Sequence, residues 1–176
     1  MISFTDSNLY LQDDVVDFES LSGYRDHRIR LTTNKLLHLR NEFGFKQLRF
    51  YCRKKKVGTV LHIMTKTGPL GEAVVNFFIQ DNPVPARPQA CGSYTVLPDN
   101  NSTLSKDCTK LGWNGTHAES TWSAKGLDGI YRIQKPLFRY GDSHRLHSAP
   151  TIRDCDDWGS GAVNLSPGDT LAVFVR

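Results

Sequence analysis

The chain has 176 residues, of which 39% are hydrophobic and 23% are charged, and its formal net charge is +4. A chain of this length and composition can bury a sizeable core, which excludes intrinsic disorder and favours a single domain over residues 1–176. No apolar run is long enough to span a bilayer, and the first residues lack the basic and apolar regions of a signal peptide, so we expect neither feature in this segment.

The first elements along the chain give weak signals. Residues of the N-terminal stretch that could pair with the final strand, as in a jelly roll, are Leu9, Leu11, Val15 and Phe18. Residues 27–33 alternate between apolar and polar, which indicates a strand. Residues 34–43 fit either a strand or a short helix, with Asn34 as its N-cap and Gly44 as its C-terminal stop.

The clearest pattern is the period-two alternation of apolar and polar residues over 46–53, which is typical of a half-buried strand. Residues 57–65 predict a second, buried strand, and 53–58 predict a hairpin connection with solvated charges. For 72–80 we prefer a strand to a helix, because Val, Phe and Ile favour the pleated surface. Residues 169–175 predict a central strand buried on both faces.

Most of the Pro, Asn, Ser and Gly residues lie in 81–129, which cannot form a long regular element and is expected to be a loop-rich insertion. Many short strands separated by turns predict a mostly-β fold. The predicted architecture is an antiparallel β-sandwich, with a jelly roll as one form of it, that has long irregular loops and two disulfides.

The four cysteines have none of the spacings that suggest zinc or redox chemistry. Of the three ways to pair them, we predict Cys91 with Cys108, which closes a short turn-rich stretch, and Cys52 with Cys155. An even number of cysteines outside metal motifs is typical of secreted proteins, where disulfides persist.

Sequons for N-glycosylation begin at Asn100, Asn101, Asn114 and Asn164. Three of the four crowd into 100–116, between turn residues, which is typical of a glycosylated surface loop. The alternative is a polar loop in a cytosolic protein with reduced thiols. Taken together, the cysteines and the sequons favour a secreted or extracellular glycoprotein.

Positive charge is concentrated at the predicted hairpin tip, in Arg53, Lys54, Lys55 and Lys56. Such a cluster can attract sulfated glycans or other anionic partners, although it could equally be a solvated turn that protects a sheet edge. Nucleic acid is not an expected partner, because the chain contains no recognisable nucleic-acid-binding module.

Three further groups of residues are candidate sites. Carboxylates that could supply oxygen ligands to calcium are Asp154, Asp156 and Asp157, although they could instead form a solvated acidic turn. Aromatic residues in loop-like segments that could stack on sugar rings, or else plug the ends of the sandwich, are Trp113, Trp122, Trp158, Tyr131 and Tyr140. Histidines with a conceivable catalytic role beside the acids are His144 and His147, whereas His62 is expected to be a hydrogen-bonded core residue.

No hydrolase or metalloprotease motif occurs, so an enzyme is not the preferred interpretation. The sequence favours a non-enzymatic extracellular recognition or adhesion module that binds a glycan or an extracellular protein. The alternative is a structural or matrix assembly domain of a larger or oligomeric secreted protein. A secreted hydrolase that uses the His and Asp residues named above is the third interpretation.

Overall fold

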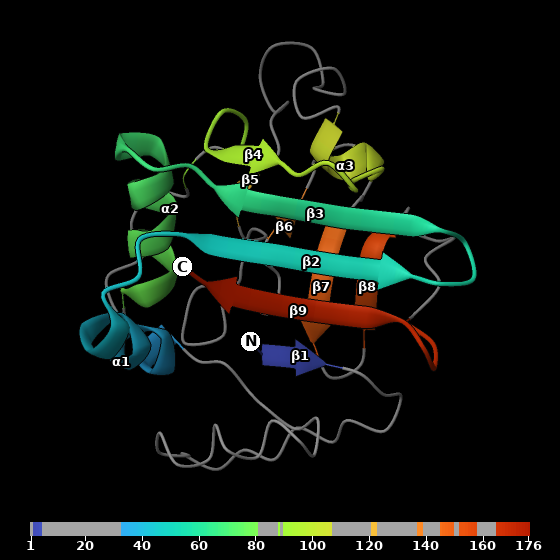
Figure 1. Cartoon of the computed structure of the whole chain (residues 1–176), viewed down its shortest axis with the longest axis horizontal. Coiled ribbons are helices and arrows are strands. Elements are labelled where there is room, and N and C mark those ends of the chain that lie inside the picture. The colour runs from blue at the N-terminus through green and yellow to red at the C-terminus, as the bar shows by residue number, and fades with distance from the viewer. Residues whose placement is uncertain are drawn as a thin grey trace.

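The computed structural model describes residues 2–4, 33–80, 88, 90–106, 121–122, 137–138, 145–149, 152–157 and 165–176. Within these residues the chain forms two antiparallel sheets and three helices (Figure 1). The apolar residues Leu9, Leu11, Val15 and Phe18 lie outside the described residues. So does the strand predicted at 27–33, except for Thr33, which is part of a helix.

The first sheet has five strands in the order β1-β9-β2-β3-β4, and each neighbouring pair is antiparallel. Its strands are β1 (Ile2–Phe4), β9 (Thr170–Val175), β2 (Leu48–Lys54), β3 (Thr59–Thr65) and β4 (Tyr94–Val96). The predicted strands at 46–53 and 57–65 and the hairpin between them are confirmed. The last strand is central, as predicted, and three consecutive residues of it, 171–173, are buried.

Ile2–Phe4 at the N-terminal end of the chain pairs with the final strand, and the jelly roll stays a prediction. The second sheet has four strands in the order β5-β6-β7-β8. Its strands are β5 (Thr121–Trp122), β6 (Leu137–Phe138), β7 (Arg145–Ala149) and β8 (Ile152–Asp157). In Figure 1, β7 and β8 cross behind the first sheet, and β8 contacts both β2 and β3.

Helix α1 (Thr33–Phe43) resolves the ambiguity of 34–43 in favour of a helix. Gly44 ends it with a φ of 62°, the left-handed conformation that glycine adopts without strain, and its N–H donates to the Arg40 carbonyl. The predicted N-cap is wrong, because the helix already includes Thr33 and Asn34 lies within its first turn.

Helix α2 (Pro69–Ile79) overturns the strand predicted for 72–80. Pro69 occupies the first turn, where its missing N–H costs nothing. The buried residues Gly71, Val74, Val75 and Phe78 have helical i, i+3, i+4, i+7 spacing, and this period outweighs the strand preference of the individual residues. Gly71 permits a close approach, because a Cβ there would lie 1.9 Å from the Lys66 carbonyl oxygen.

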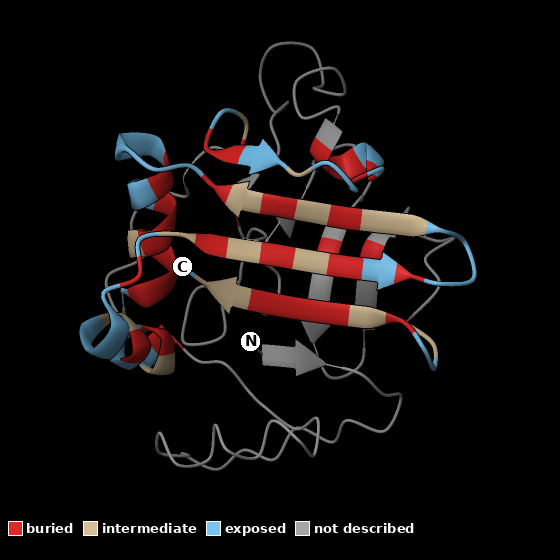
Figure 2. Ribbon diagram, viewed as in Figure 1, coloured by how far each residue is buried: buried red, intermediate tan, exposed pale blue. Residues whose placement is uncertain are grey.

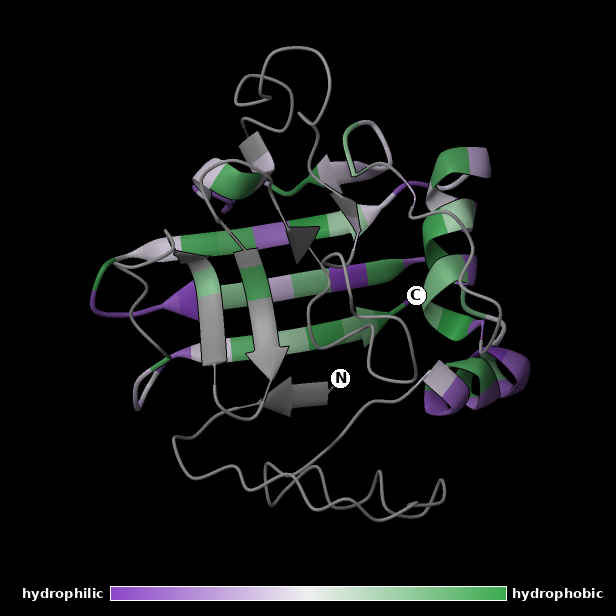
Figure 3. Ribbon diagram, turned by 180° about the vertical axis from the view of Figure 1, so that it is seen from behind, coloured by the Kyte–Doolittle hydropathy of each residue, from purple (hydrophilic) through white to green (hydrophobic). Residues whose placement is uncertain are grey.

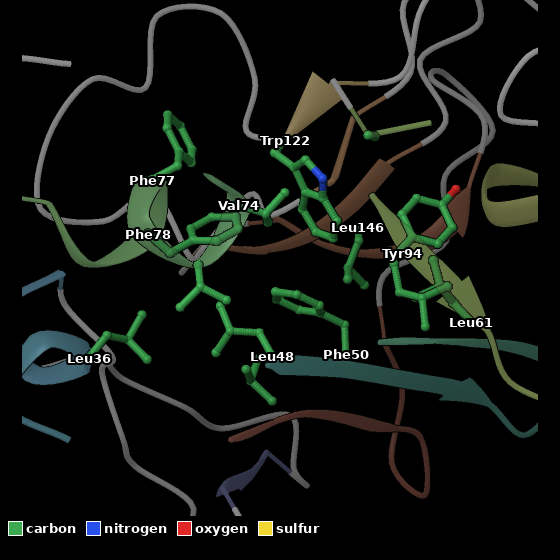
Figure 4. Close-up of a cluster of buried hydrophobic side chains, with 14 of the residues drawn as sticks. Leu36, Leu48, Phe50, Leu61, Val74, Phe77, Phe78, Tyr94, Trp122 and Leu146 are labelled. Atoms are coloured by element: carbon green, nitrogen blue, oxygen red, sulfur yellow. The ribbon is translucent and has the colours of Figure 1, made fainter. Parts of the chain in front are cut away.

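The core fills the space between the inner face of the first sheet, α2 and parts of the second sheet (Figure 4). Trp122 lies at its centre with ring centroids 5.4 Å from Phe50, 5.8 Å from Phe78 and 5.8 Å from Tyr94. Seen from behind, strands β2, β3 and β9 and helix α2 are mainly hydrophobic, and the β2–β3 hairpin combines hydrophilic and hydrophobic segments (Figure 3). A short helix, α3 (Thr103–Lys106), closes one side, where the Tyr94 hydroxyl donates to the Ser105 carbonyl.

A disulfide between Cys52 of β2 and Cys155 of β8 joins the two sheets inside this core, as predicted. It links residues 103 positions apart in the chain. Cys91 is also disulfide-bonded, but Cys108 lies outside the described residues, so the pairing of these two cysteines stays a prediction.

Candidate functional site

The outer face of the first sheet is the side that turns away from the core. The register places three rows of residues on it, which are Arg49, Tyr51 and Arg53 of β2, Met64, His62 and Val60 of β3, and Phe174, Ala172 and Thr170 of β9. Every one of them except Ala172 is at least partly exposed, and this alternation of buried and partly exposed bands is visible in Figure 2. The outer face is therefore a surface on which side chains from three strands meet.

Cationic side chains contact apolar and aromatic groups at one end of the outer face. The Arg49 guanidinium lies 3.8 Å from the centroid of the Phe174 ring, a cation–π geometry. Arg176, directly after β9, places Nη1 3.9 Å from the sulfur of Met64. This end of the face therefore combines two positive charges with an aromatic ring.

Tyr51 and His62 occupy the middle of the outer face, with ring centroids 5.0 Å apart in an edge-on arrangement. His62 Nδ1 lies 2.5 Å from the Asp99 carboxylate, which comes from the loop after β4. His62 was expected in the core. It is hydrogen-bonded as predicted, but its place on the outer face shows that the expected core position is wrong.

Two buried polar atoms of the outer face, Arg49 Nε and His62 Nε2, have no hydrogen-bond partner among the residues that the structure describes. Nearly all buried polar atoms in folded proteins are hydrogen-bonded, so an unpartnered one often marks a place for bound water or ligand. Both atoms belong to neighbouring positions on the same face.

The other end of the outer face leads into the basic hairpin, which consists of Arg53, Lys55 and Lys56. These three side chains are exposed. Lys54 is only 3% exposed, so the prediction that it belongs to a solvated anion-binding cluster is wrong. The reason is the strand period, because Lys54 continues the inward row of Leu48, Phe50 and Cys52.

Asp169 holds the base of the basic hairpin. Its buried carboxylate accepts hydrogen bonds from the Lys55 N–H at 2.7 Å, the Ser166 N–H at 2.8 Å and the Ser166 hydroxyl at 3.0 Å. Burial alone would raise the pKa of Asp169, but these hydrogen bonds and the charge of Lys54 outweigh burial and hold that pKa below its usual range.

Of the aromatic residues predicted as a ligand-binding set, the structure describes Trp122 alone. Trp122 is completely buried, and its Nε1–H donates to the Ser93 hydroxyl at 2.7 Å, so its predicted place at a binding surface is wrong. Residues of this set that lie outside the described residues are Trp113, Trp158, Tyr131 and Tyr140. The structure instead leaves Tyr51 and Phe174, which lie on strands, partly exposed.

The predicted calcium ligands lie on a strand. Asp154, Asp156 and Asp157 belong to β8, so the alternative of an acidic turn is wrong, whereas calcium binding by these residues stays a prediction. No group of three or more His, Cys, Asp or Glu in the described part of the chain could hold a metal ion. Of the catalytic candidates, His147 pairs in register with Asp154, and His144 lies outside the described residues.

The predicted glycosylation sites also differ in environment. Asn100 is buried and Asn101 is exposed, whereas Asn114 lies outside the described residues. The occupancy of all three sites stays a prediction, and of the two described asparagines Asn101 alone has the exposed side chain that a surface glycan needs.

No protein-family model, curated protein or solved structure matches this chain. Within the described ranges, no helix has the length and hydrophobicity needed to cross a membrane. The geometry of the outer face is therefore the basis for any functional proposal.

Proposed function

We propose that this protein is a non-enzymatic extracellular recognition module that binds an anionic glycan along the outer face of its first sheet. One observation carries the proposal, namely that positively charged side chains lie at both ends of a partly exposed sheet face with aromatic and imidazole groups between them. Arg49 and Arg53 are four residues apart on β2, which corresponds to about 13 Å along the strand.

This arrangement suits an extended, negatively charged polysaccharide. Arg49 and Arg176 at one end and the basic hairpin at the other supply charge-assisted hydrogen bonds to sulfate or carboxylate groups. Tyr51 lies between the two ends and offers an apolar ring on which a sugar can pack. Because the three strands are hydrogen-bonded to one another, the face is preorganised and little entropy is lost on binding.

Two further elements of the proposal concern compartment and architecture. The buried disulfide between Cys52 and Cys155 supports an oxidising, extracellular location. The crossing of β7 and β8 behind the first sheet supports a β-sandwich, in which the second sheet covers the inner face and leaves the outer face for a ligand.

Calorimetric titration with heparin oligosaccharides and with a neutral oligosaccharide tests the proposal. We expect binding of the sulfated chain that weakens as salt is raised, because screening reduces exposed charge interactions. Arg53→Ala should weaken binding about 10- to 150-fold, since a charge-assisted hydrogen bond contributes about 1.5–3 kcal/mol. The matched control is Lys35→Ala, which removes one positive charge from α1.

Equal binding of the neutral and sulfated chains, or equal effects of the two variants, would overturn the assignment to the outer face. Repeating the titration with calcium and with a chelator tests the predicted contribution of Asp154, Asp156 and Asp157.

An assembly domain is the second candidate. It is favoured by three large apolar side chains that are about two-thirds exposed, Phe43, Val57 and Leu70 at 64%, 65% and 63%. Sedimentation analysis tests it, because a stable oligomer that dissociates in a Leu70→Ser variant would favour assembly over glycan recognition.

A further inference from the structure

The edge of β3 is covered in two different ways along its length. Strand β4 pairs with Ile63, Met64 and Thr65 only. Beyond that point the edge meets residues 100–102, whose asparagine side chains take the place of a pairing strand.

The hydrogen bonds at this edge are specific. Asn100 Oδ1 accepts from the His62 N–H at 2.8 Å, and Asn101 Oδ1 accepts from the Val60 N–H at 2.6 Å. Asn101 Nδ2 donates to the Gly58 carbonyl at 2.8 Å, and the Asn101 N–H donates to the Val60 carbonyl at 2.9 Å. The two neighbouring asparagines thus satisfy backbone groups that an edge strand would leave open.

These two asparagines are the first residues of overlapping sequons, Asn100-Asn101-Ser102 and Asn101-Ser102-Thr103. Their side chains differ in burial. Asn100 is only 6% exposed, and its Oδ1 also accepts from the buried Ser105 hydroxyl at 2.9 Å. Its Nδ2 is buried, which leaves no room for a sugar. Asn101 is exposed, and so is Thr103, the hydroxyl residue of its sequon.

We infer that Asn101 is the glycan-bearing asparagine of this pair and that Asn100 is a structural residue whose sequon stays unmodified in the folded protein. This inference rests on the extracellular location contained in the proposed function. It does not depend on what the outer face binds.

The modification is the ordinary transfer from a lipid-linked oligosaccharide diphosphate. A bond forms between Asn101 Nδ2 and the first sugar carbon, and the bond from that carbon to the diphosphate oxygen breaks. The diphosphate leaves with the electron pair, and one Nδ2 proton is lost to a base. The amide nitrogen begins with two hydrogens, so it retains one after the transfer.

A glycan at Asn101 would stand beside the Gly58 end of β3, next to the basic hairpin. Bulky, hydrated sugar at this point shields the part of the sheet edge that β4 does not cover. A glycan on Asn101 can therefore shield the edge of β3, whereas the buried Asn100 cannot carry one.

Site mapping on the full chain, directed into the secretory pathway of a eukaryotic cell by a fused signal peptide, tests the inference. Enzymatic release of N-glycans in ¹⁸O-labelled water converts each modified asparagine into labelled aspartate, and fragmentation distinguishes position 100 from position 101. We expect label at Asn101 and none at Asn100.

Two variants of Thr103 form a matched pair. Thr103→Ala removes the Asn101 sequon and leaves the Asn101 side chain and the Asn100 sequon in place, so one glycan should be lost. Thr103→Ser keeps the Asn101 sequon and should keep the glycan, which separates loss of the acceptor from damage to α3.

Label at Asn100 in the secreted chain, or no label at Asn101 in the wild-type chain, would overturn the inference. An occupied Asn101 together with no binding of heparin oligosaccharides would refute the proposed function and leave this inference standing.

Discussion

The inner and outer faces of the first sheet are built from alternate residues of the same strands. On the inner face Leu48, Phe50 and Cys52 are completely buried, whereas Arg49 and Tyr51 between them are partly exposed on the outer face. The inner row stabilises the fold because it removes apolar area from water. The outer row contributes less to stability, so the fold tolerates side chains there that serve binding.

Lys54 shows how strict the difference between the two faces is. It extends the inner row by one position, and its charge is accommodated because it lies near the carboxylate of Asp169 at the end of the strand. Burying a charge is costly unless a partner compensates it. The following predictions test the comparison of the two faces in order of decreasing effect.

The largest effect is expected from Phe50→Ala on the inner face. Phe50 is completely buried and packs against Phe78 and Trp122, so the free energy of unfolding should fall by about 3–5 kcal/mol. Phe174→Ala, on the outer face of the neighbouring β9, is the matched control and should cost clearly less. Urea unfolding followed by fluorescence measures both, and similar losses would show that the faces do not differ as described.

The disulfide ties the inner face to the second sheet. A Cys52→Ala, Cys155→Ala double variant should lose about 2–4 kcal/mol of unfolding free energy, because the unfolded chain gains the entropy of a long open loop. Thermal unfolding of the variant and the parent measures this loss. An unchanged midpoint would mean that the link between the sheets contributes nothing to stability.

Asp169→Asn should cost about 1–3 kcal/mol, because an amide cannot accept all the hydrogen bonds of the carboxylate and Lys54 loses its compensating charge. Asp99→Asn on the outer face is the control and should cost less, since Asp99 is exposed. Urea unfolding at neutral pH compares the two variants, and equal losses would contradict this account of the hairpin base.

The same residue predicts a pH dependence with a definite sign. The pKa of Asp169 is lowered on folding, so its stabilising contribution is fully present above the unfolded carboxyl pKa of about 3.9 and is lost as the pH falls through the folded value. Unfolding measured from neutral to acidic pH should therefore show a smaller acid-induced loss in Asp169→Asn than in the parent. Equal pH dependence of the unfolding free energy in the parent and in Asp169→Asn would refute the stabilising role of the Asp169 carboxylate.

The smallest effect is expected from the contact between Arg49 and Phe174. A double-mutant cycle with Arg49→Ala and Phe174→Leu should give a coupling of about 0.5–1 kcal/mol, the range for cation–π pairs near the surface. Chemical denaturation of the four proteins measures it. A coupling of several kcal/mol would mean that this outer-face pair contributes as much to stability as contacts on the inner face, which would contradict the comparison.

Much of the first sheet could be predicted from local patterns. The alternation at 46–53, the hairpin after it and the Gly44 stop are properties of neighbouring residues, and all three are confirmed. Helix α2 carries two opposing local signals, because its Val, Phe and Ile residues favour a strand whereas its buried residues have helical spacing. The spacing is the signal that identifies the helix.

The candidate site was less predictable. The alternation already placed Arg49 and Tyr51 on the polar side of a strand, but nothing local said that Phe174 would lie beside Arg49. The same limit applies to the asparagines, because the sequons at Asn100 and Asn101 look alike in the sequence. Their burial distinguishes them, because Asn100 is only 6% exposed and also bonds to Ser105, whereas Asn101 is exposed.

The sequence by itself determined the strand period, the hairpin and the stop signal at Gly44. These follow from backbone geometry over a few residues, whereas four cysteines leave three pairings open and the structure selects Cys52 with Cys155. Tertiary structure alone decided which charges are buried, which sequon is exposed and which side chains share the outer face. Those properties depend on contacts between residues far apart in the chain, as between Lys55 and Asp169, which no local pattern encodes.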